Sequence, residues 1–173
     1  MSKSNELRWY LPLRDLFGAA VTKYQKGQRG ASKFFNARAL AYLATIGQTA
    51  QEIYDFAEDH ARGGEPDWET VLLISAARRD YFLTVQRGKT SKRVIATEEF
   101  TPKDGKVGGI PWLPRLIEKA EAKLRGELPA DLMYDCGGDR RFFTEHDRHP
   151  ADFLRVTWAA NGDRKKILRF VRG

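Results

Sequence analysis

The sequence predicts a mainly α-helical fold, a bundle of several helices. Apolar side chains recur every three to four residues along most of the chain, which is the period of an amphipathic helix. Glycines, prolines and capping residues divide these stretches from one another. Hydrophobic residues make up 42% of the chain and charged residues 31%. This composition is typical of a folded globular protein and not of a disordered one.

Four helices are predicted in the first eighty residues. The third begins at a capping box, in which the Thr49 hydroxyl accepts a free backbone N–H and the Glu52 carboxylate reaches back to the cap. Asp67 is the expected cap of the fourth helix. The four predicted helices cover residues 12–24, 32–46, 50–62 and 68–79, and glycines separate the first three and end the third.

Residues 81–97 allow two interpretations. Tyr81 to Val85 and Val94-Ile95 are strand-forming residues on either side of Gly88, which predicts a minor hairpin. Alternatively the fourth helix continues to Gln86, and we favour this interpretation. Residues 101–109 contain one proline and three glycines and are typical of a linker. The expected organisation is an N-terminal helical unit at 1–87, a linker or hairpin at 88–107 and a C-terminal helical unit at 108–173, packed as one compact body.

The C-terminal unit is expected to begin with a helix at Pro114, because proline is tolerated in the first helical turn. Gly126 ends this helix. Three further helices are predicted at 139–146, 150–160 and 163–171. The apolar stripe of the first helix consists of Leu113, Leu116, Ile117, Ala120 and Leu124.

The chain also matches itself at a shift of one hundred positions. Such a match predicts two diverged helical repeats, although amphipathic helices also match one another by chance. Trp9 and Trp112 stand at the start of the two halves. The aligned pairs are Phe34 with Tyr134, Tyr42 with Phe142, Leu43 with Phe143, Ile53 with Phe153, Tyr54 with Leu154 and Phe56 with Val156.

Charge and cysteine content narrow the class of protein. The net charge of +7 is spread evenly, with 15 basic against 12 acidic residues in 1–100 and 15 against 11 in 101–173. A nucleic-acid partner is therefore considered but not favoured. No apolar run approaches the length of a membrane span and no signal peptide is apparent. With the single cysteine Cys136, these features predict a cytoplasmic protein without a membrane partner.

The segment 134–142 contains the densest set of candidate functional residues. Gly137 and Gly138 before a helix could present free N–H groups to an anion, with charge added by Arg140 and Arg141. The alternative is that Asp139 caps the helix and occupies those donors.

A thiolate–imidazole pair of Cys136 with His146 or His149, oriented by Asp135 or Asp139, is a second candidate. A lone cysteine is more often a small buried hydrophobe. The Cys and His spacing does not match zinc sites, so the sequence predicts neither a metal nor a cofactor.

Three other patterns are better explained without a site. Gly88-Lys89-Thr90 matches the end of a phosphate-binding loop, but Leu83 stands where the first glycine is required. The acidic residues between Glu52 and His60 are expected to form a solvated helix face. The basic C-terminal helix is expected to contribute its apolar side to the core.

From Gly108 onward the sequence resembles an uncharacterised bacterial family with a domain of unknown function. The resemblance covers residues 108–171 and rests on Gly108-Gly109, the stretch from Trp112 to Ile117, and the later Asp139-Arg-Arg-Phe142 and Pro150-Ala-Asp-Phe-Leu154. It implies a small, mostly helical cytosolic protein, and it implies no activity, cofactor or catalytic residue.

Our leading hypothesis is a non-enzymatic helical binding or scaffold protein that contacts a protein or an anionic ligand through Trp112, Arg115 and Lys119. The alternative is an enzyme or binder that acts on a small anionic ligand near 135–146. Weak nucleic-acid binding is a second alternative, and the oligomeric state is left open. The candidate residues of the first alternative are Gly137, Gly138, Arg140, Arg141 and His146.

Overall fold

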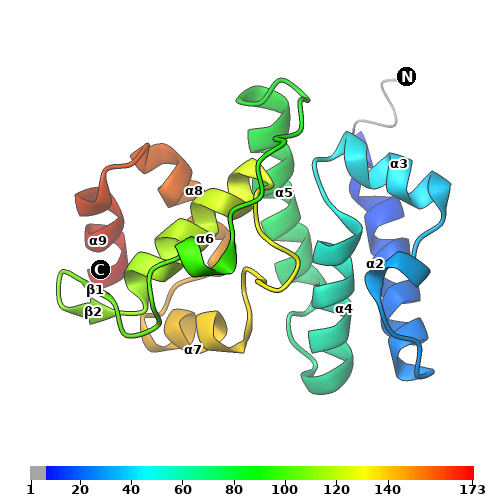
Figure 1. Cartoon of the computed structure of the whole chain (residues 1–173), viewed down its shortest axis with the longest axis horizontal. Coiled ribbons are helices and arrows are strands. Elements are labelled where there is room, and N and C mark those ends of the chain that lie inside the picture. Colours follow the sequence, from blue (N-terminus) through cyan, green and yellow to red (C-terminus); the bar gives the residue numbers. More distant parts are fainter. Residues whose placement is uncertain (1–6) are drawn as a thin grey trace. The chain divides into compact units, whose positions relative to one another are not determined.

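The computed structural model describes residues 7–173, and it is mainly helical (Figure 1). A two-stranded antiparallel hairpin supplies the β-structure of these residues. The predicted fold class, mainly α with a minor hairpin, is therefore confirmed. None of the helices in residues 7–173 combines the length and the apolar character that a membrane span requires.

The elements follow one another along the chain in this order. The helices α2 Tyr10–Gln25, η1 Ala31–Lys33, α3 Ala37–Thr45, α4 Ala50–Gly63 and α5 Trp68–Thr84 come first. They are followed by η2 Thr97–Glu99, β1 Lys106–Val107, β2 Ile110–Pro111, α6 Leu113–Arg125, α7 Gly137–Glu145, α8 Pro150–Ala160 and α9 Arg164–Arg172.

The predicted start of the second helix, at residue 32, was wrong. Residues 31–33 form the short η1 turn, and α3 begins only at Ala37. The Asn36 side chain accepts the backbone N–H of Ala39 at 2.9 Å and caps the helix there. A side-chain acceptor at this position satisfies a backbone donor that the helix itself leaves free.

The predicted start of α4 and the favoured interpretation of 81–97 are both confirmed. Thr49 and Glu52 form the capping box, and Gly64 ends α4 in the left-handed conformation. Asp67 Oδ1 accepts the backbone N–H of Thr70 at 2.8 Å. Helix α5 continues to Thr84, short of the predicted Gln86, and the hairpin alternative at 81–97 is wrong.

The observed hairpin covers Lys106 to Pro111, so it begins within the stretch 101–109 that was expected to be a linker and extends beyond it. Val107 pairs with Ile110 around a two-residue turn, Gly108-Gly109. Both glycines have positive φ, 57° and 80°, as a type I′ turn requires. A Cβ on Gly108 would lie 2.5 Å from a Leu168 methyl group, so glycine also lets the turn approach α9.

The chain divides into two compact units, one ending at Ser75 and one covering Ala76–Gly173. The boundary between these units falls inside α5. In the first unit α2 packs chiefly on α4, and the two helices lie side by side in Figure 1. The core of this unit includes Leu13, Phe17, Leu43, Ile53 and Phe56.

In the second unit α6 packs on α8, and α8 packs on α9. Helix α6 is buried on most sides, and even Lys119 and Lys123 expose 1% of their surface or less. It ends at Gly126, whose φ is 70°. A Cβ there would lie 2.6 Å from the buried Arg78 guanidinium, and a cation at a helix C-terminus is favourable.

Helices α3 and α7 have matching backbones one hundred positions apart. Both are nine residues long, and the residues at 47 and 147 have positive φ. The N–H of Gln48 donates to Leu43 O at 3.0 Å, and the N–H of Arg148 donates to Phe143 O at 2.9 Å. The helices that follow them begin at Ala50 and Pro150.

Candidate functional site

A buried ion pair between Lys119 and Asp139 lies at the centre of the candidate site. Their side chains are 1% and 0% exposed. Asp139 Oδ1 accepts the indole N–H of Trp112 at 2.9 Å, and Oδ2 accepts the backbone N–H of Asp135 at 2.9 Å. A buried charge pair is tolerated when further hydrogen bonds satisfy its lone pairs, and these contacts provide them.

The indole of Trp112 is fixed by both its backbone and its ring. Trp112 precedes α6 with φ 67° and ψ −30°, a region that bulky residues rarely adopt. Its backbone N–H donates to Gly105 O at 3.1 Å. The ring packs so closely on Gly138 that a Cβ there would lie 2.7 Å from it.

Trp112 lines a hollow of about 320 Å³, which we call the Trp112 cleft. The His146 ring stacks on Phe142 in its wall, with centroids 4.2 Å apart and planes at 20°. Arg141 is exposed and makes no ion pair or hydrogen bond within residues 7–173. The cleft is lined by Gly109, Ile110, Pro111, Trp112, Gly138, Arg141, Phe142, Glu145 and His146.

The structure brings together half of the residues that the sequence singled out. Four of them, Trp112, Gly138, Arg141 and His146, line the Trp112 cleft. Aromatic rings, one unpartnered cation and a carboxylate can bind a ligand there, and the hairpin contributes one wall.

The other four candidates do not line the cleft. Arg115 is buried and donates to Thr101 O at 2.9 Å, with its guanidinium over the Phe100 ring. Lys119 is held by Asp139, so neither cation is displayed to a partner. Arg140 donates to the carbonyl of Asp135, and Gly137 is exposed at the start of α7.

The anion site at the start of α7 stays a prediction, but the alternative in which Asp139 caps this helix is wrong. Cys136, and not Asp139, is the N-cap residue, and its side chain makes no cap hydrogen bond. Asp139 instead brings a buried negative charge into the first turn. Since a carboxylate is favourable at this end of a helix, the protein itself supplies the anion.

The thiolate–imidazole pair of Cys136 with His146 is wrong for a geometric reason. Cys136 and His146 cap opposite ends of α7, and ten residues of helix span about 15 Å. His149 Nδ1 accepts the N–H of Ala151 as the cap of α8. The sulfur of Cys136 lies 3.4 Å from Lys119 Nζ.

A neutral phenol links the segment before α7 to α8. Tyr134 is 1% exposed, and its hydroxyl donates to Pro150 O at 2.8 Å. Burial raises the pKa of this phenol well above its ordinary value, and the nearby carboxylates of Asp135 and Asp139 raise it further. The hydroxyl therefore remains a donor throughout the neutral range.

Two functional features were missed by sequence reasoning. Asp139 was considered a cap or an orienter, and nothing in a single sequence indicates that Lys119 faces it. The Gly108-Gly109 pair between Val107 and Ile110 is a hairpin signal and could have located the cleft wall. Within residues 7–173 no group of three or more His, Cys, Asp or Glu side chains is placed to hold a metal ion.

Comparison with known proteins identifies no relative of this chain. No protein-family model matches the chain, and no similar curated protein or solved structure is found.

Proposed function

We propose that the C-terminal unit is a non-enzymatic binding module whose Trp112 cleft takes a small ligand with a planar apolar group and one anionic group. One observation carries this proposal: the rigidly held indole of Trp112 and the unpartnered guanidinium of Arg141 line the same cleft. An aromatic wall provides apolar contact area, and a guanidinium binds carboxylate or phosphate through two parallel hydrogen bonds.

The size and charge of the cleft restrict the ligand further. Its volume of about 320 Å³ lies at the lower end of ordinary ligand pockets, about 300–1,000 Å³. Glu145 contributes a negative charge one helical turn from Arg141, which disfavours a ligand with several anionic groups. We therefore expect a single-ring organic anion.

Binding is supported over catalysis by the placement of the candidate catalytic groups. An enzyme acting through Arg140, Arg141, Cys136 and His146 requires these side chains to share one pocket. Only Arg141 and His146 line the cleft. His146 Nδ1 lies 2.9 Å from Phe142 O, so this nitrogen is already committed to a contact within α7.

The test is an NMR titration of the ¹⁵N-labelled protein with single-ring carboxylates such as benzoate and phenylacetate. The indole N–H signal of Trp112, assigned with Trp112→Phe, should shift, and Arg141→Ala should weaken binding by about tenfold, the loss of one charged hydrogen-bonding group. Arg155→Ala, which removes an arginine of α8 outside the cleft, is the control. An unmoved Trp112 signal, or unchanged affinity of Arg141→Ala, would refute the proposal.

We also propose that the two helical sets arose by duplication. The equal lengths of α3 and α7, the starts of α4 and α8 one hundred positions apart and the shared hydrogen bond after α3 and α7 support it. The same helix pairs, α2 with α4 and α6 with α8, make the principal contacts of each unit. A pair of relatives, each carrying one set as a separate folded chain, is the observation that would establish it.

A cytoplasmic location and membership of the uncharacterised bacterial family remain proposals. The location is supported by the single cysteine and the family by the residues from Gly108 to Val171. Fractionation of cells that express the tagged chain tests the location.

A further inference from the structure

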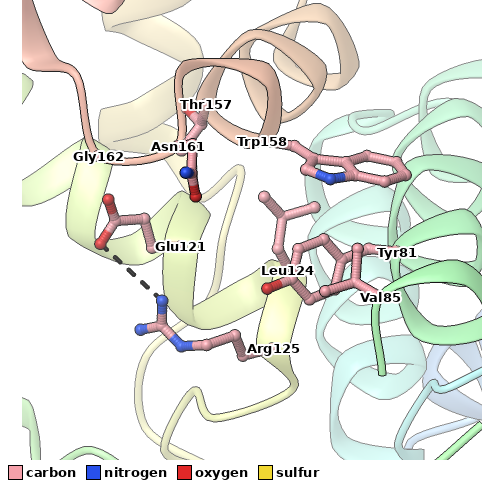
Figure 2. Close-up of a pocket in the computed structure, with 9 residues that line it drawn as sticks. All are labelled: Tyr81, Val85, Glu121, Leu124, Arg125, Thr157, Trp158, Asn161 and Gly162. Atoms are coloured by element: carbon pink, nitrogen blue, oxygen red, sulfur yellow. Dashed lines mark ion pairs between the residues drawn. The ribbon is translucent and has the colours of Figure 1, made fainter. Parts of the chain in front are cut away.

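A second hollow lies in the C-terminal unit, where parts of α5, α6 and α8 meet (Figure 2). Its volume is about 560 Å³, which suits a ligand of one or two rings. It shares no residue with the Trp112 cleft. We call it the Trp158 pocket, and it is lined by Tyr81, Val85, Glu121, Leu124, Arg125, Thr157, Trp158, Asn161 and Gly162.

One side of the Trp158 pocket is apolar. The rings of Tyr81 and Trp158 meet edge to face, with centroids 5.4 Å apart and planes at 73°. Leu124 lies beside them, and Figure 2 shows these three side chains grouped on one side. Glu121, Arg125 and Asn161 lie on the other side. A ligand here meets an apolar surface and a polar surface together.

The most informative group is the hydroxyl of Thr157. Thr157 is only 3% exposed, and its Oγ1 has no hydrogen-bond partner in the part of the chain that is described. A buried hydroxyl without a partner destabilises the folded protein. Thr157 lines the pocket, but its Oγ1 has almost no accessible surface, so a ligand hydroxyl satisfies it once the side chains that cover this atom move aside.

Three more polar groups of the pocket lack an intramolecular hydrogen bond. They are the Tyr81 hydroxyl, the Trp158 indole N–H and the Asn161 side-chain amide, judged over residues 7–173. With Thr157 they offer both donors and acceptors and carry no charge. This set matches a ligand with several hydroxyl groups.

The charged residues of the pocket are paired within the protein. Arg125 Nη1 lies 4.0 Å from Glu121 Oε2, and Arg125 Nε lies 2.8 Å from Glu127 Oε2. A cation surrounded by two carboxylates attracts an anion weakly, because their charges offset its own. The pocket therefore favours a neutral ligand.

We propose that the Trp158 pocket binds a neutral saccharide of one or two rings. A pyranose ring has an apolar C–H face and a rim of hydroxyls, which matches aromatic rings beside uncharged hydrogen-bonding groups. Tyr81 and Trp158 contact the C–H face. Thr157 and Asn161 hydrogen-bond to hydroxyls, and a site built this way rejects analogues without them.

The binding test uses the indole N–H signal of Trp158 in the full chain, assigned with Trp158→Phe. The protein is titrated to about 100 mM with glucose, galactose, mannose, N-acetylglucosamine, maltose and cellobiose, and with cyclohexanol as an apolar ring that carries one hydroxyl. At least one sugar should shift the Trp158 signal and leave the Trp112 signal in place. No shift with any sugar, or equal binding of cyclohexanol, overturns the proposal.

Two variants test the residues. Thr157→Val keeps the shape of the side chain and removes the hydroxyl, so it should weaken sugar binding about three- to tenfold while raising the midpoint of thermal unfolding. Asn161→Gly keeps the left-handed conformation observed at φ 48° and should weaken binding similarly. Thr22→Val, in α2, should leave binding unchanged. Unchanged affinity of both pocket variants contradicts the assignment, and a lower unfolding midpoint of Thr157→Val contradicts the unpartnered hydroxyl.

Discussion

The regions around α3 and α7 have nearly the same backbone but differ at one buried position. At the start of α3, Phe34 contacts the ring of Tyr54 edge to face, with centroids 4.8 Å apart, and Ala39 is buried. The position one hundred residues after Ala39 is Asp139, in the first turn of α7. Asp139 is buried in an ion pair with Lys119. The first region is held by apolar packing, and the second adds a buried charge pair to aromatic packing of its own.

This difference explains how the second region fixes a side chain beside a cleft. Apolar burial is roughly proportional to area and has no direction, so it secures α3 without dictating the orientation of any polar group. The carboxylate of Asp139 accepts hydrogen bonds from particular directions, and the indole of Trp112 is one of its donors. A buried polar group thus determines the geometry of the candidate site.

The largest expected effect comes from breaking the buried pair. Lys119→Met should lower the free energy of unfolding by about 3–5 kcal/mol, because it leaves the Asp139 charge buried and unpaired. Adding Asp139→Asn, which removes the charge and keeps one acceptor for the Trp112 and Asp135 N–H groups, should recover part of that loss. Urea denaturation of the single and double variants measures both values.

A matching double-mutant cycle in the region of α3 uses Phe34→Leu and Tyr54→Leu. The coupling energy between these two aromatic side chains should be about 0.5–1.5 kcal/mol. Additive effects of the Lys119 and Asp139 changes would remove the distinction between the two regions.

The second-largest expected effect tests how closely the Trp112 ring packs on Gly138. Gly138→Ala should cost about 1–3 kcal/mol, because its Cβ would meet the indole ring at 2.7 Å, and it should also displace the Trp112 indole signal. Gly137→Ala is a matched control, since its Cβ would meet only the Arg140 guanidinium, at 3.9 Å. It should stabilise the helix slightly. Equal effects of the two alanines in thermal unfolding would argue against the close contact.

The third prediction compares the two helix starts. Asn36→Ala removes the side-chain acceptor of α3 and should cost about 1 kcal/mol. Cys136→Ala at the equivalent position removes no cap hydrogen bond and should cost less than half as much. Chemical denaturation of both variants decides whether α7 depends on its N-cap side chain as α3 does.

The smallest effect is a pH dependence in the second unit. Burial of Glu127 opposes its ionisation, but hydrogen bonds from Arg125 and Ser91 outweigh burial and lower the pKa of this carboxyl. A lowered pKa stabilises the fold above the carboxyl's unfolded-state pKa, and this contribution is lost as the pH falls through the folded-state pKa. Glu127→Gln should therefore flatten the acid side of the stability curve, by less than the effect of Asn36→Ala. Parallel acid unfolding curves for the two proteins would contradict this.

Most helix boundaries could be predicted because their causes are local. Thr49 and Glu52 cap α4 through residues three positions apart, and Gly126 ends α6 because glycine adopts positive φ without strain. The start of α3 was predicted too early because Ser32 and Asn36 are both plausible caps. The hydrogen bond to Ala39 N selected Asn36.

The sequence by itself determined the helical class, the capping of α4 and α5, and the residue types from which a cleft could be built. Only the tertiary structure decided that Lys119 faces Asp139, that Cys136 and His146 are separated by α7, and that Thr157 is buried beside a pocket. The physical reason is the separation along the chain over which each interaction acts. Capping and helix period act over a few neighbouring residues, whereas the pairing of Lys119 with Asp139 depends on how α6 and α7 pack.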